Sequence, residues 1–282
     1  MIISKKRLAA AIAIAVLLPV FLPGCASRKD NAPQQAPAEN REPFKAAVYY
    51  VKIQNQEEYL VREIHPLPET KDKLKAAAQE LIMGEPITKG AEKIFPAGTK
   101  ILGITVENGL ATVNFSREVL QASVGSEGEA LGIQSMVNTL TEFPEVRAVS
   151  FQVEGKLDAR IKDWWGHVGL YNQPFHRDLS KVYEPAIWVT HPVENQIISV
   201  PLLVKGNARV SGGAVFVRLR DKNGKILAEG RTTAAKAAPE RGDFELSLKF
   251  EPSPGQGYLE VFEKSTQDGS ERNKVTVPVR WQ

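Results

Sequence analysis

The sequence predicts two folded domains: an α+β domain over residues 48–180, followed by an all-β immunoglobulin-like sandwich over residues 183–282. Up to about residue 160, β-rich runs alternate with two segments whose apolar residues have helical spacing. Beyond Glu184 the helical spacing disappears, and short alternating runs separated by turn signals replace it. The length of 282 residues suits one large or two ordinary domains. A content of 43% hydrophobic and 24% charged residues excludes a disordered chain and a polytopic membrane protein.

The first domain is expected to open with a hairpin and a helix. Two β-rich runs, at 48–53 and 59–64, flank a short polar turn. Thr70 is expected to cap the helix that follows, whose apolar residues lie between positions 74 and 82. The helix is expected to stop at Gly84, because glycine often follows the last helical residue.

A second hairpin, a second helix and a strand complete the predicted first domain. Asn-Gly between the runs 100–106 and 110–115 is a strong hairpin signal, because both residues tolerate positive φ. Ser126 and Glu129 have the spacing of a capping box, which predicts the start of a helix with one apolar face. A strand is expected at 146–153. This order of elements predicts helices packed on a mixed or antiparallel sheet.

The second domain is predicted from alternation of apolar and polar residues. In residues 244–250 (FELSLKF) every second side chain is apolar, which is typical of a strand with one face in a core. Asn223-Gly224 and Asp268-Gly269 supply turns. Five strands are expected, at 197–205, 214–220, 244–250, 258–263 and 274–279. This spacing fits an immunoglobulin-like sandwich without a cysteine pair.

Residues 1–24 have the pattern of a lipoprotein signal peptide. Three basic residues stand at positions 5–7, and residues 8–22 are apolar apart from one proline. A stretch of this length is too short to span a hydrocarbon core about 30 Å thick, which favours a cleaved signal. Residues 22–25 (LPGC) resemble the lipobox of bacterial lipoproteins, although proline is unusual next to the glycine. The resemblance implies lipid transfer to Cys25, including diacylglyceryl and palmitate chains, and cleavage before it.

Cys25 is the single cysteine of the sequence, which excludes intrachain disulfides and cysteine-based metal clusters. A chance cysteine at the end of an ordinary signal is the alternative. Residues 25–47 contain three prolines and no periodic apolar face, so we expect the lipidated cysteine to be followed by a flexible Pro/Ala/Gln linker. The protein is therefore expected outside the cytoplasm, anchored by lipid to the outer face of the bacterial membrane or to a spore membrane.

The charge distribution argues against a nucleic-acid partner. The formal net charge of +3 lies entirely in residues 5–7, and the remainder carries equal numbers of basic and acidic residues. Residues 48–180 have a net charge of −4 and residues 181–282 one of +3. Opposite charges favour docking between domains or self-association, but exposed charges are screened beyond about 8–10 Å. Two unremarkable surfaces are the alternative, and the oligomeric state stays open.

The first domain resembles a known family. The resemblance is carried by residues 95–100 (FPAGTK), 111–116 (ATVNFS), 134–146 (QSMVNTLTEFPEV) and 149–155 (VSFQVEG). These segments are similar to the GerM domain of sporulation and spore-germination proteins, over most of residues 48–180. The resemblance implies a role in extracytoplasmic assembly during sporulation or germination, and it implies no catalytic site.

The second domain carries a separate resemblance. Residues 199–208 (SVPLLVKGNA), 217–224 (VRLRDKNG) and 261–270 (VFEKSTQDGS) are similar to the immunoglobulin-like domain of bacterial spore germination. This domain often follows a GerM domain, so the two resemblances support each other. Residues 211–213 (SGG) depart from the family, which tends to carry an aromatic residue and an acid there.

One segment is a candidate binding surface. Trp164, Trp165, His167 and Tyr171 bring aromatic faces that could stack on a sugar or a peptide. The alternative is that the segment is a lid over the sheet, with one tryptophan in the core and His167 hydrogen-bonded in a loop.

No catalytic motif is recognisable. The sequence has no Gly-x-Ser-x-Gly, phosphate-binding Gly-Lys-Ser or His-Glu-x-x-His pattern, and its four histidines are widely separated. We therefore expect no cofactor, no metal and no enzyme activity. The leading hypothesis is a lipid-anchored protein that contacts envelope or sporulation proteins. A module that binds peptidoglycan glycan through the tryptophans is the second hypothesis, and an unrecognised hydrolase is the third.

Overall fold

The computed structural model describes residues 42–251 and 254–282. The predicted signal peptide, Cys25 and the linker up to residue 41 lie outside the described residues. These described residues belong to one compact unit. Within the described ranges, no helix has both the length and the apolar character needed to cross a membrane.

The first domain has two sheets with helices between them. The first sheet has the order β3-β1-β2-β8 and is built from β1 (Phe44–Gln54), β2 (Glu57–Leu67), β3 (Ala91–Glu92) and β8 (Val182–Glu184). The second sheet has the order β4-β5-β6-β7 and is built from β4 (Ile101–Glu107), β5 (Leu110–Phe115), β6 (Ala148–Val153) and β7 (Phe175–His176). Both sheets mix parallel and antiparallel pairs.

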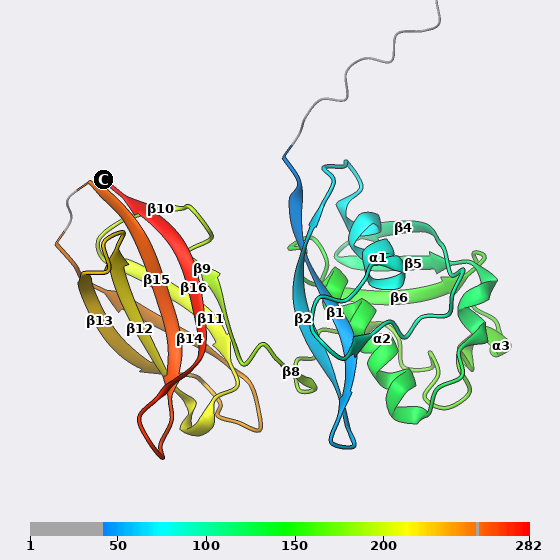
Figure 1. Cartoon of the computed structure of the whole chain (residues 1–282). Helices are drawn as coiled ribbons and strands as arrows, with labels where there is room; N and C mark the ends of the chain where they lie inside the picture. Colours follow the sequence, from blue (N-terminus) through cyan, green and yellow to red (C-terminus); the bar gives the residue numbers. More distant parts are fainter. Residues whose placement is uncertain (1–41, 252–253) are drawn as a thin grey trace, which may run out of the picture. The chain divides into compact units, whose positions relative to one another are not determined.

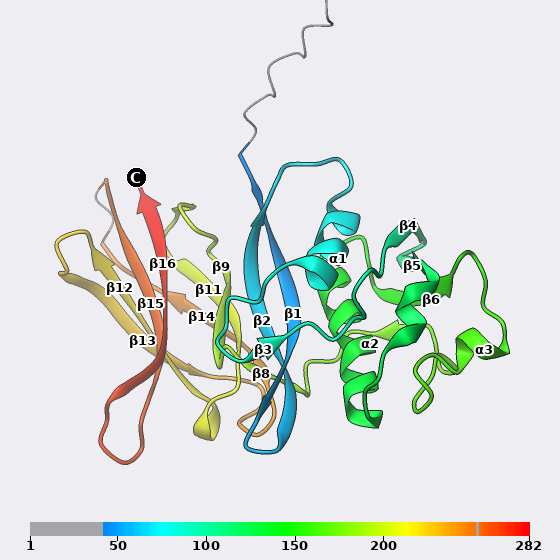
Figure 2. The ribbon, with the colours of Figure 1, turned by 45° about the vertical axis from the view of Figure 1, so that its right-hand side comes forward.

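The helices α1 (Lys73–Met83) and α2 (Ser126–Leu140) both contact β1, while α1 also contacts β4 and α2 also contacts β6. Figures 1 and 2 show both helices between the β1–β2 hairpin and the strands β4 to β6. The sequence predicted helices on a single sheet, and the structure instead gives them a sheet on each side. Helix α2 has 11 of its 15 residues buried, and Ser126, Glu127 and Ala130 remain exposed. The buried part of this helix is therefore wider than the single predicted apolar face.

Both predicted hairpins of the first domain are confirmed. The β1–β2 turn has positive φ at Asn55 and Gln56, and the β4–β5 turn at Asn108 and Gly109. Between the paired strands and α2 lies an apolar core that includes Tyr50, Phe115, Phe151, Met136 and Leu140. Two short helical elements, the 3₁₀ helix η1 (Arg117–Gln121) and α3 (Ala159–Lys162), connect the larger ones.

Three local predictions are corrected. Strand β1 begins at Phe44, so the last four residues of the predicted linker 25–47 pair with β2 instead. Helix α1 is capped by Asp72, whose Oδ1 accepts a hydrogen bond from the backbone N of Lys75 at 3.0 Å, and Thr70 is not its cap. Helix α2 has no side-chain cap, because its N-cap is Gly125 and not the predicted Ser126, and the Glu129 carboxylate bonds the 165–169 loop instead.

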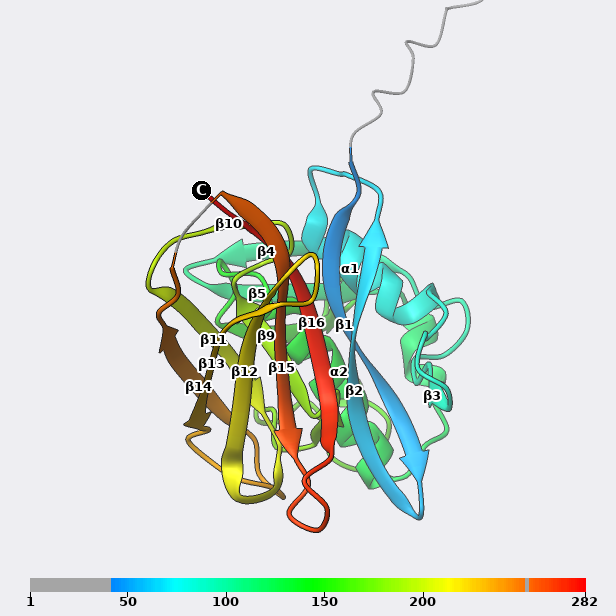
Figure 3. The same ribbon diagram turned by 60° about the vertical axis from the view of Figure 1, so that its left-hand side comes forward.

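The second domain is the predicted all-β sandwich. One sheet has the order β10-β16-β15-β12-β13 and the other the order β14-β11-β9. Their strands are β9 (Ile187–His191), β10 (Ile197–Ile198), β11 (Leu202–Ala208), β12 (Ala214–Asp221), β13 (Ile226–Thr233), β14 (Gly242–Leu248), β15 (Gly255–Lys264) and β16 (Glu271–Trp281). Figure 3 shows β12, β15 and β16 side by side. Apolar residues of both sheets, among them Val204, Val217, Leu259 and Val279, form the core.

Two differences from the expected strands have a physical reason. The run 197–205 is divided between β10 and β11, which belong to different sheets, and Pro201 between them has no N–H to continue a ladder. The unusual residues Ser211–Gly213 form the 3₁₀ turn η2, where Gly212 and Gly213 have φ of 62° and 73°. This backbone favours glycine over the aromatic and acidic residues expected there.

Candidate functional site

The two tryptophans predicted to bind ligand lie in the core. Trp164 is 5% exposed and Trp165 is 8% exposed. The Trp164 ring stacks on Phe151 with 5.8 Å between centroids, and on Trp165 with 5.6 Å. The Trp165 Nε1–H donates to the carbonyl of Val119 at 2.7 Å. Neither indole has a free face for a sugar, so the predicted stacking surface is wrong for these two residues.

His167 and Tyr171 lie on the same loop but point outward. The backbone carbonyl of Val124 is 2.9 Å from His167 Nε2, and because a carbonyl only accepts, this nitrogen donates. Tyr171 is 62% exposed. The alternative prediction therefore holds and extends further: both tryptophans are in the core, and His167 is hydrogen-bonded in a loop.

A buried carboxylate holds this loop in place. Glu129 on α2 is fully buried, and its two oxygens accept hydrogen bonds from four backbone N–H groups. The donors are Trp165 at 3.3 Å, His167 at 2.8 Å, Val168 at 3.0 Å and Gly169 at 2.8 Å. A carboxylate that accepts several backbone bonds satisfies its charge without an ion pair. We infer that Glu129 is a structural residue.

Trp164 shows how strongly the loop is constrained. Its φ is 47°, in the left-handed region that bulky residues rarely adopt. Its buried Nε1–H has no hydrogen-bond partner among the described residues. Both features cost free energy, so the geometry is imposed by the surroundings, above all by Glu129 and by the stacked rings.

The remaining buried polar residues of α2 are also satisfied internally. Ser135 donates to the carbonyl of Gly132 at 2.7 Å, and Asn138 donates to the carbonyl of Asp178 at 2.7 Å. The hydroxyl of Thr139 accepts from the backbone N of Tyr49 at 3.2 Å. These bonds connect α2 to β1 and to the segment before β8, so the polar residues of the helix serve its packing.

An ion network lies where α2 ends. Arg62 on β2 makes two 3.1 Å hydrogen bonds to the carboxylate of Glu142, and Arg177 makes one of 2.6 Å. The Tyr49 hydroxyl donates to the same carboxylate at 2.5 Å. Burial alone would raise the pKa of Glu142, but the hydrogen bonds and charges of the two arginines outweigh it and lower the pKa to about 2. Glu142 is therefore ionised at any physiological pH.

Trp188 connects this network to the second domain. Its ring lies 5.0 Å from the Arg62 guanidinium and 4.1 Å from that of Arg241. It shares an apolar cluster with Tyr49, Leu60 and other residues of the first domain. Cation–π contacts of this kind are strongest when they are desolvated, as here.

Arg241 is buried without a carboxylate partner among the described residues. It donates to the Asn207 side chain at 3.1 Å and to four backbone carbonyls, those of Val182, Tyr183, Pro185 and Ala186. Burial, with smaller contributions from Arg209 and Arg62, lowers the pKa of Arg241 to about 9. Its donors fix the segment 182–186 between the two domains.

A cavity of about 810 Å³ lies beside these residues and is lined by Arg177, Trp188, Lys205, Arg241 and Asp243, among others. Its basic groups are already engaged, since Arg177 bonds Glu142, Arg241 bonds carbonyls and Lys205 pairs with Glu245 at 2.9 Å. We therefore assign these groups to holding the structure.

One histidine lies between two carboxylates. His65 Nδ1 is 2.7 Å from Glu80 and Nε2 is 2.8 Å from Glu63, whose oxygens also accept from the backbone N of Ile87 and Thr88. Both ring nitrogens are occupied, so neither is free to take a proton from a substrate. In the parts of the chain that the structure describes, no cluster of three or more metal-ligating side chains is found.

Four residues of these clusters were not predicted from the sequence: Arg62, Glu142, Trp188 and Arg241. Trp188 stands in an apolar run (AIWV, 186–189) that was a usable strand signal. The charged residues had no local signal, because their partners lie 34 to 93 positions away.

Two family models match the chain. The family described as "Sporulation and spore germination" matches residues 47–158, and the family described as "Immunoglobulin-like domain of bacterial spore germination" matches residues 186–270. Among curated proteins, the spore germination protein GerM of Bacillus subtilis (strain 168) is 29% identical over 101 residues. This alignment covers 34% of the present chain, which spans about a quarter (27%) of the length of that relative.

Solved structures give matches of low overall similarity. The first GerMN domain of the sporulation protein GerM from Bacillus subtilis is 24% identical with a TM-score of 0.40, over 48% of this chain and 98% of that one. A putative lipoprotein from Clostridium perfringens is 16% identical with a TM-score of 0.35, over 49% of this chain and 90% of that one.

The order of the two family matches agrees with the order of the two domains in the structure. Neither family description names an enzyme. Residues 47–158 are therefore similar to a sporulation and spore germination family, and residues 186–270 to an immunoglobulin-like domain of bacterial spore germination.

Proposed function

We propose that this protein is a lipid-anchored, non-enzymatic envelope protein that makes protein–protein contacts during sporulation or spore germination. The observation that carries the proposal is the tandem of two spore-germination domain families, at 47–158 and 186–270. The lipoprotein pattern that ends at Cys25 supplies the anchor.

The geometry of the described polar clusters supports a binding role over a catalytic one. Catalytic groups need access to a substrate and a free donor or acceptor. Glu129, Glu142 and Arg241 are instead saturated with hydrogen bonds from the chain itself. The residues available for binding a partner are therefore those on the surfaces of the two domains.

The anchor is tested by labelling cells with radioactive palmitate. The wild-type protein is expected to carry label and to fractionate with membranes, whereas Cys25→Ala is expected to lose both properties. Ser27→Ala is the matched control and should behave as wild type. Retention of label by Cys25→Ala would contradict lipidation at this residue.

The contact role is tested by crosslinking the lipidated protein in sporulating and germinating cells, followed by identification of the captured proteins. The proposal predicts envelope or sporulation proteins that the Cys25→Ala variant fails to capture. Capture of wall glycan alone, with no protein, would favour the glycan-binding hypothesis and contradict ours.

A further inference from the structure

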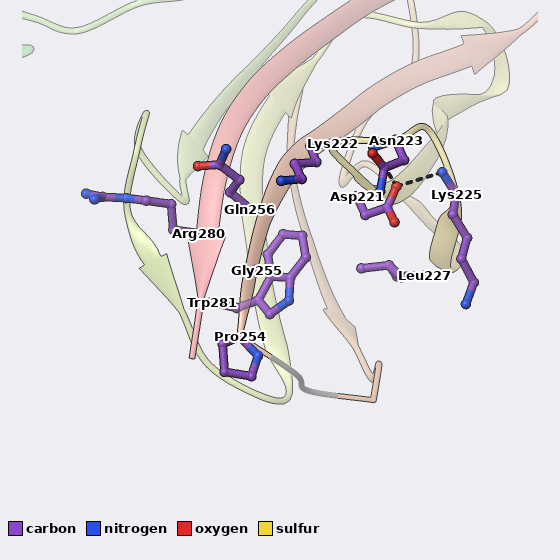
Figure 4. A pocket seen from close by; sticks show the side chains of 10 residues that line it. All are labelled: Asp221, Lys222, Asn223, Lys225, Leu227, Pro254, Gly255, Gln256, Arg280 and Trp281. Atoms are coloured by element: carbon purple, nitrogen blue, oxygen red, sulfur yellow. Dashed lines mark hydrogen bonds between the residues drawn. The ribbon is translucent and has the colours of Figure 1, made fainter.

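A pocket at one end of the second domain belongs to none of the clusters described above. It has a volume of about 490 Å³ and lies among the β12–β13 turn, the start of β15 and the end of β16 (Figure 4). Its lining includes Asp221, Lys222, Lys225, Leu227, Arg280 and Trp281. Loops and turns at the end of a rigid sandwich are a common place for binding sites.

The indole of Trp281 lies in the middle of the residues that line the pocket. Figure 4 shows the ring between Pro254 and Leu227, facing the space between the strands. The residue is only 5% exposed and packs edge-on against Phe250, with 5.9 Å between the ring centroids. Its Nε1 lies over Gly255, where a Cβ would be 2.9 Å from the nitrogen, and this N–H is not among the fully buried unpaired atoms of the described residues. With no hydrogen bond to a described residue, the donor is open to an acceptor in the pocket.

The charged residues of the pocket have a positive excess. Lys222, Lys225 and Arg280 are opposed by one acid, Asp221. One oxygen of Asp221 already accepts from the backbone N of Asn223 at 2.9 Å and of Lys225 at 2.8 Å, so this acid is committed to its turn. No ion pair joins either lysine to an acid within the described part of the chain. Arg280 reaches out to the carbonyl of Asn195.

We propose that this pocket binds an acidic peptide segment of a partner protein, with an apolar side chain against Leu227 and Pro254 and a carboxylate between the Trp281 N–H and the two lysines. The proposal rests on the proposed contact function and names the chemistry of the partner. A pocket of this volume holds one or two side chains, and a carboxylate satisfies the lone indole donor while pairing with free ammonium groups.

The same features disfavour a phosphate polymer of the cell wall as the occupant. Phosphate sites typically use clustered backbone N–H groups or bidentate arginines. The turn N–H groups of Asn223 and Lys225 are already taken by Asp221, and the Arg280 guanidinium bonds Asn195. The groups still available in the pocket are apolar lining residues and two separate lysines. This combination suits a ligand with a carboxylate beside an apolar side chain.

The test is a titration of the full-length lipid-free chain (Cys25→Ala) with the peptide Ac-Gly-Phe-Asp-Glu-Gly-NH₂. Binding is measured by the heat released in a calorimeter or by the change in Trp fluorescence. The amide peptide Ac-Gly-Phe-Asn-Gln-Gly-NH₂ and poly(glycerol phosphate) are the comparison probes. We expect saturable binding of the acidic peptide that weakens with salt, and binding of the amide peptide at least tenfold weaker. Stronger binding of poly(glycerol phosphate) than of the acidic peptide would overturn the proposal.

Variants separate the pocket from general charge. Lys222→Gln/Lys225→Gln is expected to weaken peptide binding at least tenfold, whereas Arg231→Gln/Lys249→Gln removes the same charge elsewhere in the domain and should change it less than twofold. Trp281→Phe keeps a ring and removes the donor, with an expected loss of about tenfold, and thermal unfolding shows whether it is folded. Equal effects of the two double variants would overturn the proposal.

The outcome is distinct from that of the proposed function. If the wild-type chain captures envelope proteins in cells and both double variants capture them equally, the contact function stands and the pocket assignment fails. If no protein is captured by any variant, the contact function itself fails.

Discussion

The two domains stabilise themselves in different ways. Of the ten buried polar or charged side chains among the described residues, eight lie in the first domain and two, Asn207 and Arg241, lie in the second. In the sandwich, strict alternation sends charged residues outward, as in the network around Arg218 on the outer face of β12. In the first domain a helix lies between two sheets, so its polar residues are buried and must find partners in the chain.

This difference teaches where each domain is vulnerable. Breaking the hydrogen bonds of a buried carboxylate lowers the free energy of unfolding far more than breaking an exposed ion pair does. Changes to single buried polar groups should therefore damage the first domain, while charge changes on the sheet surface should leave the second almost unaffected.

The largest expected effect is that of Glu129→Ala. The substitution leaves four backbone N–H groups of the 165–169 loop without an acceptor, so we expect a loss of about 3–5 kcal/mol in the free energy of unfolding. Urea unfolding followed by Trp fluorescence measures it. Glu127→Ala, on the same helix but exposed and paired with Lys181, is the control and should cost less than about 1 kcal/mol. Equal losses would contradict the structural role of Glu129.

The next largest effect is expected in the pH dependence of the free energy of unfolding. The pKa of Glu142 is lowered from 4.5 to about 2 in the folded protein, so its contribution is present above the unfolded pKa and is lost as the pH falls towards 2. The shift corresponds to about 3 kcal/mol. Unfolding of the wild type and of Glu142→Gln at pH 6 and pH 3 measures it.

The difference between these two proteins should shrink at pH 3, because the Glu142 carboxyl is then mostly protonated in the unfolded wild type, and folding must remove that proton. Hydrogen exchange should locate the acid effect in the first domain. A constant difference between pH 6 and pH 3 would contradict the assigned role of Glu142.

A smaller effect is expected where Trp165 packs on α2. A Cβ at Gly132 would lie 2.5 Å from the Trp165 ring, whereas a Cβ at Gly128 would lie 3.1 Å from Val124. Gly132→Ala should therefore cost about 1–3 kcal/mol through overpacking, partly offset by better helix propensity. Gly128→Ala is the matched comparison and should cost less. If Gly128→Ala lowered the unfolding temperature more than Gly132→Ala, the Trp165 ring would have to move away from α2 at little cost, and this prediction would be wrong.

The smallest effect is expected on the surface of the second domain. Lys236 and Glu240 form an exposed ion pair four residues apart. Lys236→Ala should leave the midpoint of urea unfolding unchanged, because exposed ion pairs contribute little to stability. A clear decrease in that midpoint would contradict the contrast between the domains.

Local sequence patterns predicted much of the fold. Asn108-Gly109 and the alternating run around Phe244 predicted their hairpin and strand, because turn chemistry and two-residue periodicity are local properties. The second sheet over the helices was not predictable in this way. Whether Glu129 caps its own helix or binds a loop some 40 residues later depends on packing, which no local spacing encodes.

The same limit explains the candidate site. An aromatic pair such as Trp164-Trp165 is equally compatible with a binding surface and with a core, and only the tertiary neighbours decide. The pocket around Trp281 could not be predicted from the sequence either. It is formed by a turn, the start of one strand and the end of another, which are far apart along the chain.

The most direct test of the whole account is complementation of a deletion strain of the source bacterium, with counts of heat-resistant spores and the time course of germination. The account predicts a defect that wild-type protein repairs and that Cys25→Ala, expressed at the same level, does not. A deletion strain that sporulates and germinates as the parent does would contradict it.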